Sequence, residues 1–390
     1  MKNRKLYNRN KIIIIGGNHF NTIGLIRSFG VNGLKPYLIL VSKKRENNYC
    51  AKTKFICGVV IVNNYEDVLD ILRKGFQNEP VRPVLVPSSD AAIFLIDSNH
   101  DELSNRYILP SINNKQGEIA RLMNKAEQAD WAKSLGIKTA QTHLIIFDQE
   151  IDYNQLPIPC IVKPVLSHEG AKKDIRKCNT IEELKGYIDI LKENGYYRIL
   201  LQEFLNKDYE MELFGTIMEH QEVIPYILTK HVREWPIVGG SVCCHEFILD
   251  EYYHNQARDI LKKIKEYGYV GNFDIEIINV GGDIYLNEIN FRNSGDVYAC
   301  FHNKIFYSYY GYLDMIGVQN KNINTKYSNK YYAMCEDRDL MWVKNGLLSF
   351  TKWLRFLIKT RDFAYFSIGD LRPSLAYYKV YFRNMIKNKR

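Results

Sequence analysis

The amino-terminal part of the chain alternates between short, continuously apolar runs and amphipathic runs of helical period. Ile12–Ile15 is apolar throughout and ends at Gly16 and Gly17, and a helical pattern follows from Ile23 to Phe29. Apolar runs of this length between turn residues are typical of buried strands. Their alternation with helices predicts a parallel α/β sheet, with further strands at 36–41, 59–62 and 84–86 and a helix at 66–74.

The rest of the chain has longer strands and a different ending. A helical pattern runs from Glu118 to Leu135 and ends at Gly136. The last seventy residues are rich in aromatic and basic side chains. Strands are expected at 158–162, 199–202, 212–218 and 223–229, and helices at 181–193, 256–267 and 347–360.

The most informative pattern is a hairpin whose two strands are joined by the glycine-containing loop 279–283. Side chains on a strand alternate between its two faces. Asp274 and Glu276 therefore share one face of the first strand. Glu288 and Asn290 likewise share one face of the return strand.

A turn that is symmetric about Gly282 would place Glu276 opposite Glu288, and Asp274 opposite Asn290. Like charges in directly opposed positions, with Cβ atoms about 5 Å apart, are destabilising. A cation between the two carboxylates would remove that cost, and an all-oxygen ligand set suits Mg²⁺. The alternative is an amphipathic hairpin with an ordinary polar, solvated face.

Charge is concentrated at the two ends of the chain. The 390 residues include 53 basic and 44 acidic ones, a formal net charge of +9. Residues 1–11 and 376–390 each hold five basic residues and no acid, which leaves 43 basic against 44 acidic residues elsewhere. This distribution argues against a nucleic-acid partner. The basic ends could make peripheral contact with an anionic membrane surface, or they could be solvated termini.

Composition and cysteine spacing indicate a soluble, cytoplasmic protein. An apolar content of 46% with 25% charged residues is ordinary for a globular chain of two or three domains. None of the eight cysteines forms a Cys-x-x-Cys pair, so neither a zinc framework nor a secreted disulfide scaffold is indicated. No run of 18 apolar residues exists that could form a transmembrane segment.

The amino-terminal glycines invite a dinucleotide interpretation that their spacing does not support. The segment Gly16–Gly24 lacks the G-x-G-x-x-G pattern, and Leu38–Lys43 supplies no acid for a ribose at the end of the second strand. NAD binding is therefore not expected. A turn that presents backbone N–H groups to a small anion and a plain strand–helix turn both remain open.

Lys163 interrupts the apolar segment Cys160–Val165 and is followed by a polar loop at 166–174 with a glycine and two lysines. A lysine in such a strand commonly extends to a sheet edge, and Pro164 fits an edge as well. The alternative is that the ammonium group meets a nucleotide phosphate under the loop.

The segment Leu200–Leu205 changes from an apolar strand to a polar linker, and Glu210 follows it closely. Backbone groups at such a hinge can pair with an adenine edge, and a nearby carboxylate can accept from both ribose hydroxyls. The alternative is a solvated, acidic start of the next strand.

These features occur in the order that is typical of the ATP-grasp superfamily. Four features follow this order along the chain. They are Lys125 at a helix start, Lys163, the 202–205 hinge with Glu210, and the twelve-residue step from Glu276 to Glu288. The Glu-x-Asn-x-Arg motif that ends at Arg292 follows, with Phe291 where the family usually has proline. Over residues 11–320 the chain resembles the carbamoyl-phosphate-synthetase-like and D-aspartate-ligase-like branch of carboxylate–amine ligases.

The resemblance implies a fold and a division of the chain. It implies an amino-terminal parallel-sheet domain at 1–115, a small ATP-grasp subdomain at 116–205, a large one at 206–325 and a helical, basic extension at 326–390. Phosphates would be bound by Lys125 and Lys163, adenine by the backbone of Glu203, Phe204 and Leu205, ribose by Glu210, and one or two Mg²⁺ ions (or Mn²⁺ as a substitute) by Glu276, Glu288 and Asn290. Arg292 would face the γ-phosphate and the substrate carboxylate, and Lys230 would also reach the γ-phosphate.

The resemblance also implies an activity, in which ATP activates a carboxylate as an acyl phosphate and an amine displaces phosphate. We therefore expect an ATP- and Mg²⁺-dependent carboxylate–amine ligase with small-molecule substrates. The carboxyl-terminal block at 349–373 loosely resembles an extension on ligases of surface-polysaccharide assembly, which suggests cell-wall or capsule synthesis. A helical cap or a homodimer contact is the alternative for this block. The rival functions are a regulatory module that binds nucleotide without catalysis, and a nicotinamide-dependent enzyme.

Overall fold

The computed structural model describes residues 10–43, 47–165, 174–237, 240–327 and 330–387. Contacts within the chain divide it into two compact units. The first unit comprises residues 1–119, 212–274 and 290–390, and the second comprises residues 120–211 and 275–289. The four-part division that the resemblance implies stays a prediction.

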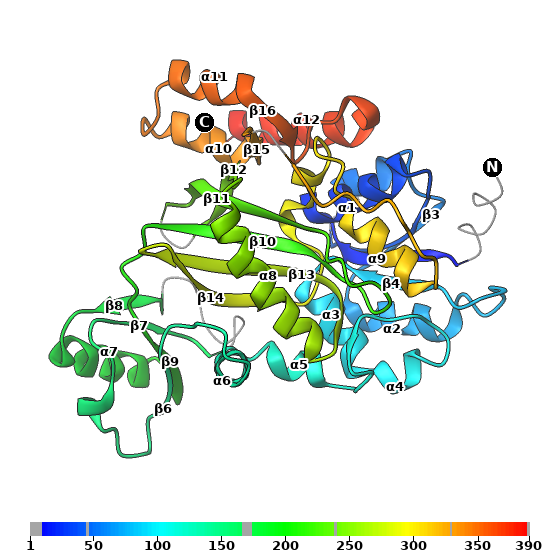
Figure 1. The fold of residues 1–390 in the computed structure, drawn as a ribbon. Coiled ribbons are helices and arrows are strands. Elements are labelled where there is room, and N and C mark those ends of the chain that lie inside the picture. Colours follow the sequence, from blue (N-terminus) through cyan, green and yellow to red (C-terminus); the bar gives the residue numbers. More distant parts are fainter. Residues whose placement is uncertain (1–9, 44–46, 166–173, 238–239, 328–329, 388–390) are drawn as a thin grey trace. The chain divides into compact units, whose positions relative to one another are not determined.

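The amino-terminal strands of the first unit form the four-stranded parallel sheet that the sequence predicts, in the order β3-β2-β1-β4. Ile13 and Ile15 pack into one hydrophobic cluster, and Ile12 and Ile14 pack into another. The central strand is therefore buried on both faces, as helices on both sides of a parallel sheet require. The elements, blue to cyan in Figure 1, are β1 (Ile12–Gly17), α1 (Phe20–Val31), β2 (Tyr37–Val41), β3 (Gly58–Val62), α2 (Tyr65–Lys74), β4 (Val84–Pro87), α3 (Asp90–Ser98) and α4 (His100–Leu103).

An eight-stranded sheet follows, in the order β14-β13-β10-β11-β12-β15-β16, with β5 paired to β13. The unit boundaries at 211/212, 274/275 and 289/290 fall inside β10, β13 and β14, so these strands carry the chain from one unit to the other. The elements are β5 (Ser111–Ile112), β10 (Tyr209–Ile217), β11 (Tyr226–Trp235), β12 (Ser241–Phe247), α8 (Glu251–Glu266), β13 (Tyr269–Val280), β14 (Asp283–Asn290), α9 (Tyr307–Met315), β15 (Tyr332–Met334) and β16 (Thr360–Phe363).

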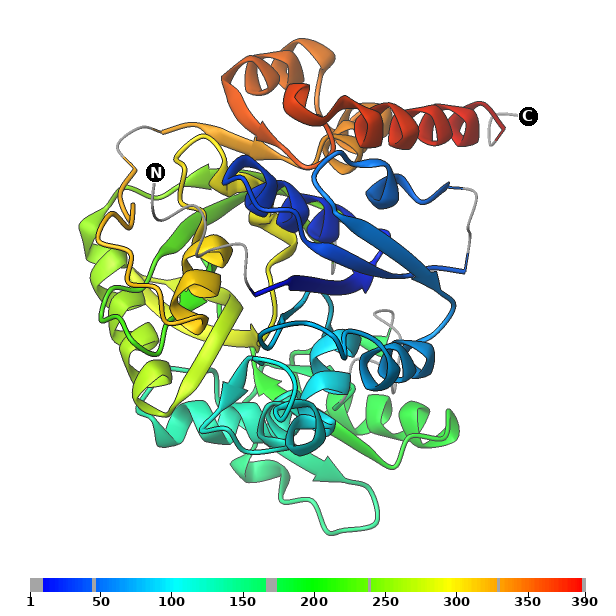
Figure 2. The ribbon, with the colours of Figure 1, turned by 90° about the vertical axis from the view of Figure 1, so that its right-hand side faces the viewer.

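The carboxyl-terminal segment belongs to the first unit and is joined to it by buried charges. The buried guanidinium of Arg27, on α1, lies 3.3 Å from Asp370 Oδ2 and donates to the Tyr365 carbonyl. The carboxylate of Glu336 accepts from three successive backbone N–H groups at 364–366 and from a tyrosine hydroxyl. The helices here are α10 (Glu336–Lys344), α11 (Phe350–Lys359) and α12 (Leu371–Lys387), the last being the red rod of Figure 2.

The second unit is built on an antiparallel sheet in the order β6-β9-β7-β8. The amphipathic helix α7 buries Leu184, Ile188 and Leu191 in the core cluster of this sheet. Lys163 ends β7, an interior strand, so the sheet-edge explanation for this lysine does not hold. The elements are β6 (Thr142–Ile146), β7 (Cys160–Lys163), β8 (Arg176–Cys178), α7 (Ile181–Glu193) and β9 (Arg198–Glu203).

The helix expected from Glu118 to Leu135 is two helices, α5 (Glu118–Leu122) and α6 (Lys125–Ser134). The Asn124 side chain accepts from the N–H groups of Ala126 and Glu127, which caps the second helix and ends the first. Lys125 is consequently the first residue of α6. Within the described ranges, no helix combines the length and apolarity needed to cross a bilayer.

Candidate active site

The β13–β14 hairpin turns on two glycines. β13 ends at Val280 and β14 begins at Asp283, and Gly281 and Gly282 have φ of +60° and +93°. Two consecutive residues of positive φ fit the two-residue turn that joins twisted strands. The turn is therefore centred between the two glycines and not on Gly282. This register differs by one residue from the predicted one.

A change in the burial pattern along β14 compensates for that difference. Ile284 and Leu286 are buried, and the next buried residue is Ile289, three positions after Leu286. A strand that inserts one extra residue changes phase in this way. We infer a β-bulge at Asn287 and Glu288, so that both of these residues oppose Glu276. Asn287 Nδ2 lies 3.1 Å from Glu276 Oε2, in agreement with this arrangement.

Two lysines meet the hairpin carboxylates in the second unit. Lys125 Nζ lies 2.8 Å from Glu288 Oε2, and Lys163 Nζ donates to Gln202 Oε1 at 2.9 Å. Burial and the positive charge of Lys125 lower the pKa of Lys163, Glu288 and Glu276 act in the opposite direction, and the net result is a pKa of about 8. Lys125, Glu276 and Glu288 thus all act electrostatically on Lys163, and Lys125 also pairs with Glu288.

This charge pattern fits a metal–phosphate group. The carboxylate oxygens are hard ligands of the kind that Mg²⁺ prefers, and the two ammonium groups suit phosphate oxygens. Like charges held close together inside protein are costly unless an ion of the opposite sign joins them. Asn290, the third predicted metal ligand, ends β14 in the first unit, where its Nδ2 lies 3.5 Å from the Asp274 carbonyl oxygen.

The predicted adenine hinge lies at the end of β9. The backbone N–H groups of Glu203 and Phe204 are bound to carbonyls of residues 141 and 159. The Leu205 N–H donates to no acceptor among the described residues, so it remains able to bind a nucleobase. Lys177 Nζ lies 3.6 Å from the centroid of the Phe204 ring. The predicted ribose ligand Glu210 forms an ion pair with Lys207.

Arg292 is the centre of a second cluster, in the first unit. Its guanidinium pairs with Asp274 and lies 3.0 Å from Asp90 Oδ1. Burial lowers the pKa of Arg292, but the two carboxylates outweigh burial and hold that pKa above its ordinary value. Asp274 Oδ1 is buried and has no hydrogen-bond partner among the described residues. Asp90 follows the carboxyl end of β4, where open α/β sheets place their ligands.

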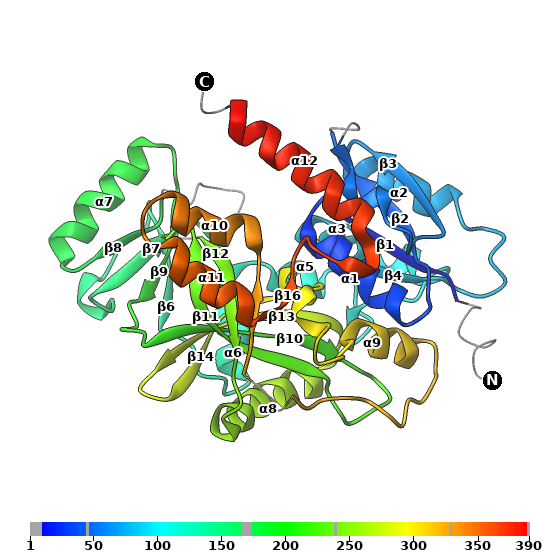
Figure 3. The same cartoon turned by 90° about the horizontal axis from the view of Figure 1, so that it is seen from above.

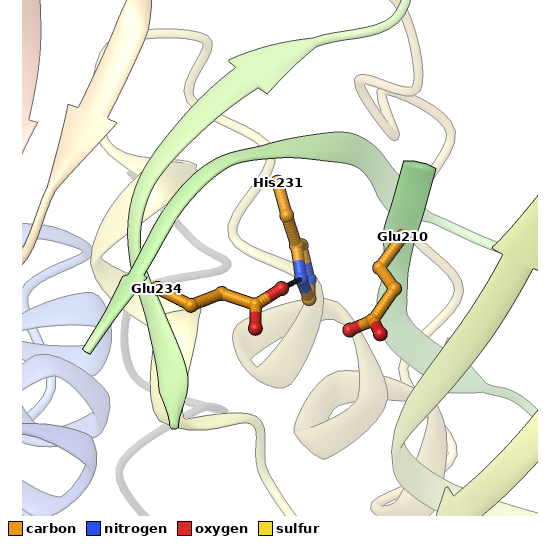
Figure 4. A group of neighbouring side chains, drawn as sticks. All are labelled: Glu210, His231 and Glu234. Carbon is orange, nitrogen blue, oxygen red and sulfur yellow. Dashed lines mark hydrogen bonds and ion pairs between the residues drawn. The ribbon is translucent and has the colours of Figure 1, made fainter. Parts of the chain in front are cut away.

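Lys230, the other predicted substrate residue, lies on β11 beside a histidine that the sequence reasoning missed. His231 Nδ1 lies 3.0 Å from Glu234 Oε1, and Figure 4 draws this contact as a dashed line. His231 Nε2 lies 3.0 Å from Glu212 Oε2. Burial raises the pKa of Glu212 well above its usual value, and Asp274 raises it further. The hydrogen bond with His231 acts in the opposite direction and lowers the pKa of Glu212. The signal in the sequence that could have revealed His231 was the presence of several charged residues in a central strand.

A third group that the sequence reasoning missed surrounds the first turn of α1. The Arg338 guanidinium lies 5.0 Å from the centroid of the Phe20 ring, and the neighbouring His19 ring is exposed. Desolvation by the surrounding protein, together with the charges of Arg338 and Arg292, lowers the pKa of His19 to about 4. His19 is therefore neutral at pH 7. The Gly16–Gly17 turn precedes this group, while residues 166–173 of the predicted phosphate loop at 166–174 lie outside the described residues.

No model of a known protein family matches the chain. Among curated proteins, it is 27% identical to a formate-dependent phosphoribosylglycinamide formyltransferase of Methanocaldococcus jannaschii, over 41% of this chain and 42% of that protein. It is 22% identical to a D-aspartate ligase of Enterococcus faecium, over 73% of this chain and 72% of the ligase. The chain thus spans about two fifths of the formyltransferase that it matches.

Solved structures match over most of the chain. An N5-carboxyaminoimidazole synthetase of Staphylococcus aureus superposes with a TM-score of 0.65 at 15% identity, covering 87% of both chains. This chain has the ATP-grasp fold. An L-amino acid ligase of Bacillus licheniformis superposes with a TM-score of 0.61 at 14% identity, over 84% of this chain and 80% of the ligase.

The ATP-grasp fold confirms the fold class that the sequence predicts. A parallel sheet comes first, mixed α and β elements follow, and the carboxyl-terminal helices are present. Since identities of 14–15% establish the fold alone, the roles of individual residues remain predictions. In this chain, the second unit brings together Lys125, Lys163, Glu276 and Glu288. The first unit holds Arg292, Lys230 and Asn290.

Proposed function

We propose that this chain is an ATP- and Mg²⁺-dependent ligase that joins a carboxylate to an amine. One observation carries the proposal, the 2.8 Å contact of Lys125 with Glu288 next to Lys163 and Glu276. Two cationic and two anionic side chains at one place suit a divalent ion carrying phosphate. The D-aspartate ligase and the L-amino acid ligase that the chain resembles support the reaction class.

The chemistry requires two anions to approach each other. A carboxylate oxygen attacks the γ-phosphorus of ATP and ADP leaves, which gives an acyl phosphate. The nitrogen of an amine then attacks the acyl carbon, phosphate leaves, and the nitrogen loses a proton. Bound Mg²⁺ would neutralise phosphate charge and orient the transferred group. No protein nucleophile takes part.

The site residues of the second unit have three roles in this proposal: phosphate ligands, metal ligands and a nucleobase contact. Lys125 and Lys163 hold phosphate oxygens, and Glu276 and Glu288 hold the metal. The Leu205 N–H pairs with the adenine edge. ADP or ATP complexes of the solved carboxyaminoimidazole enzymes support a nucleotide here.

Arg292 has the corresponding task in the first unit, where it stabilises charge on the carboxylate and the γ-phosphate. Asp274 and Asp90 orient its guanidinium plane and would exchange with the substrate anion. Asn290 as a metal ligand and Lys230 as a γ-phosphate ligand remain parts of the proposal that rest on the resemblance.

A hydroxamate assay tests the activity. The protein is incubated with Mg-ATP, hydroxylamine and a panel of carboxylic acids, and a coloured ferric hydroxamate identifies the activated acid. Glu288→Gln is expected to abolish the signal, and Glu219→Gln, at an exposed carboxylate, is expected to keep it. Nucleotide binding without ADP release for every acid would favour the regulatory module instead.

Two finer expectations stay proposals. A role in cell-wall or capsule synthesis rests on the carboxyl-terminal block, and sugar acids and amino acids in the hydroxamate panel test it. A homodimer has support from a Hydrogenobacter thermophilus biotin carboxylase domain described as a dimer, with a TM-score of 0.64 and 13% identity. Sedimentation of the full chain tests that expectation.

A further inference from the structure

Exposed apolar side chains are concentrated in the carboxyl-terminal segment of the first unit. Of the twenty large apolar side chains that are exposed among the described residues, ten lie between residues 347 and 386. This segment is about a tenth of the chain. Isolated exposed apolar residues are ordinary, whereas a contiguous group marks an interaction surface.

On α12 the exposed residues form one stripe. Leu371, Leu375, Phe382 and Ile386 have exposed fractions of 45–66%. At 3.6 residues per turn their directions lie within about 60° of one another. The opposite side of α12 packs against the first unit, because Ser374 is buried and Tyr377 stacks on another ring at 3.5 Å.

The neighbouring helix α11 carries a second stripe. Phe350, Leu354 and Ile358, at intervals of four residues, have exposed fractions of 57%, 39% and 68%. Trp353 faces inward and is buried, with its Nε1 donating to Asp339 at 2.9 Å. Both α11 and α12 lie at the upper edge of Figure 1 and are seen together from above in Figure 3.

The exposed charges of this segment are all positive. Two acids occur in the segment, Asp362 and Asp370, and both are buried. None of the basic residues in this segment pairs with a carboxylate among the described residues. They number seven and all are exposed, namely Lys352, Arg355, Lys359, Arg361, Arg372, Lys379 and Arg383.

The two helices are firmly attached to the unit that carries them. Asp370, at the start of α12, receives the buried Arg27 guanidinium and the Thr53 hydroxyl. The carboxylate of Glu336, at the start of α10, binds backbone N–H groups at 364–366. The apolar stripes are therefore a fixed surface of the folded protein and not the side chains of a frayed end.

We propose that α11 and α12 dock the protein on the surface of an anionic lipid bilayer, with the two apolar stripes inserted among the lipids. Helices with an apolar stripe flanked by lysine and arginine bind in this way, and anionic headgroups attract basic residues close to the surface. A second copy of the chain would bring seven positive charges against seven others. An acidic peptide would pair with the basic residues but would leave the apolar stripes without a partner.

Vesicle sedimentation tests the proposal with the full chain. The protein is expected to sediment with mixed phosphatidylglycerol–phosphatidylcholine vesicles, and to stay in solution with phosphatidylcholine alone. The triple variant Lys352→Glu, Arg355→Glu, Lys359→Glu is expected to bind about 100-fold more weakly, at about fivefold per lost positive charge. Leu375→Ser with Phe382→Ser is expected to weaken binding by about tenfold or more.

A matched control separates local from overall charge. Lys35→Glu, Lys74→Glu and Lys262→Glu make the same change in net charge at exposed positions elsewhere in the first unit. This variant is expected to lose no more than about fivefold. Equal losses in both triple variants would overturn the proposal, and so would an apolar variant that binds like the natural chain.

Two further outcomes would assign the surface to a different occupant. Self-association that the apolar substitutions abolish, without vesicle binding, would assign it to a second copy. Binding of polyglutamate without vesicle binding would assign it to an acidic protein. Circular dichroism of each variant confirms that a loss of binding is not a loss of folding.

Discussion

Lys125 Nζ lies 2.8 Å from Glu288 Oε2, and these residues are 163 positions apart in the chain. The side chains are each about a quarter exposed, at 23%. An ion pair this accessible contributes little to stability on its own. Its value in the proposed function is to hold a phosphate ligand and a metal ligand next to each other before nucleotide arrives.

We predict that Glu288→Gln lowers ATP turnover by roughly 10²–10³-fold, because a neutral amide cannot replace a carboxylate on Mg²⁺. Coupled ADP release measures the effect, and thermal unfolding is expected to stay within a few degrees of the natural chain. The loss of a catalytic charge costs far more than about threefold in rate. Turnover within about threefold of the natural chain would therefore contradict the metal assignment.

The lowered pKa of Lys163, at about 8, predicts proton uptake on nucleotide binding. Above pH 8 the free lysine is mostly neutral, and phosphate raises its pKa, so affinity for ATP falls as pH rises through that value. Calorimetry at pH 8.5 in buffers of different ionisation enthalpy measures the uptake. Lys163→Met is expected to remove it, whereas Lys133→Met, on the exposed side of α6, leaves it unchanged.

Arg292→Lys is predicted to lower turnover by about 100-fold and stability by about 1–3 kcal/mol. A lysine cannot pair with Asp274 and Asp90 together, so a buried carboxylate loses a partner. Urea unfolding and steady-state rates measure the two effects. Arg73→Lys is the control, because Arg73 makes a two-point contact with Glu102 at an exposed site. A similar loss in both variants would argue against a special role for Arg292.

Burial raises the pKa of Asp362 from 3.8 to about 8, against the donated bonds of the His302 N–H and the Tyr331 hydroxyl. The folded state therefore binds more protons than the unfolded state between these values, and stability falls as pH rises from about 4 to 8. Asp362→Asn is predicted to flatten that dependence.

The urea midpoint at pH 5 and at pH 8.5 measures this change. Asp148→Asn, at an exposed position, is expected to follow the natural chain. Parallel curves for the natural chain and Asp362→Asn would show that Asp362 is not the titrating group.

Local sequence patterns predicted the parts of the fold that depend on local physics. The apolar runs of β1, β2 and β4 report burial on both faces directly. The end of α5 was missed because the apolar period continues through Asn124, whose cap depends on one side-chain bond.

The missed site residues have a different cause. His231 and Glu212 are 19 positions apart, and Arg338 and Phe20 are farther apart still. Neither pair leaves a periodic signal, because their contacts depend on how separate elements pack. The carboxylates of the hairpin were predictable since a single turn sets their relation.

The inferred bulge in β14 decides which hairpin lengths can work. A two-residue turn pairs positions an odd number apart, yet Glu276 and Glu288 are an even number apart. Because Asn287 and Glu288 both oppose Glu276 in the inferred bulge, the one extra residue brings Glu288 opposite Glu276. Adding or removing one residue anywhere between the two glutamates would turn one of them away from the lysines, whereas a change of two residues would keep both in place.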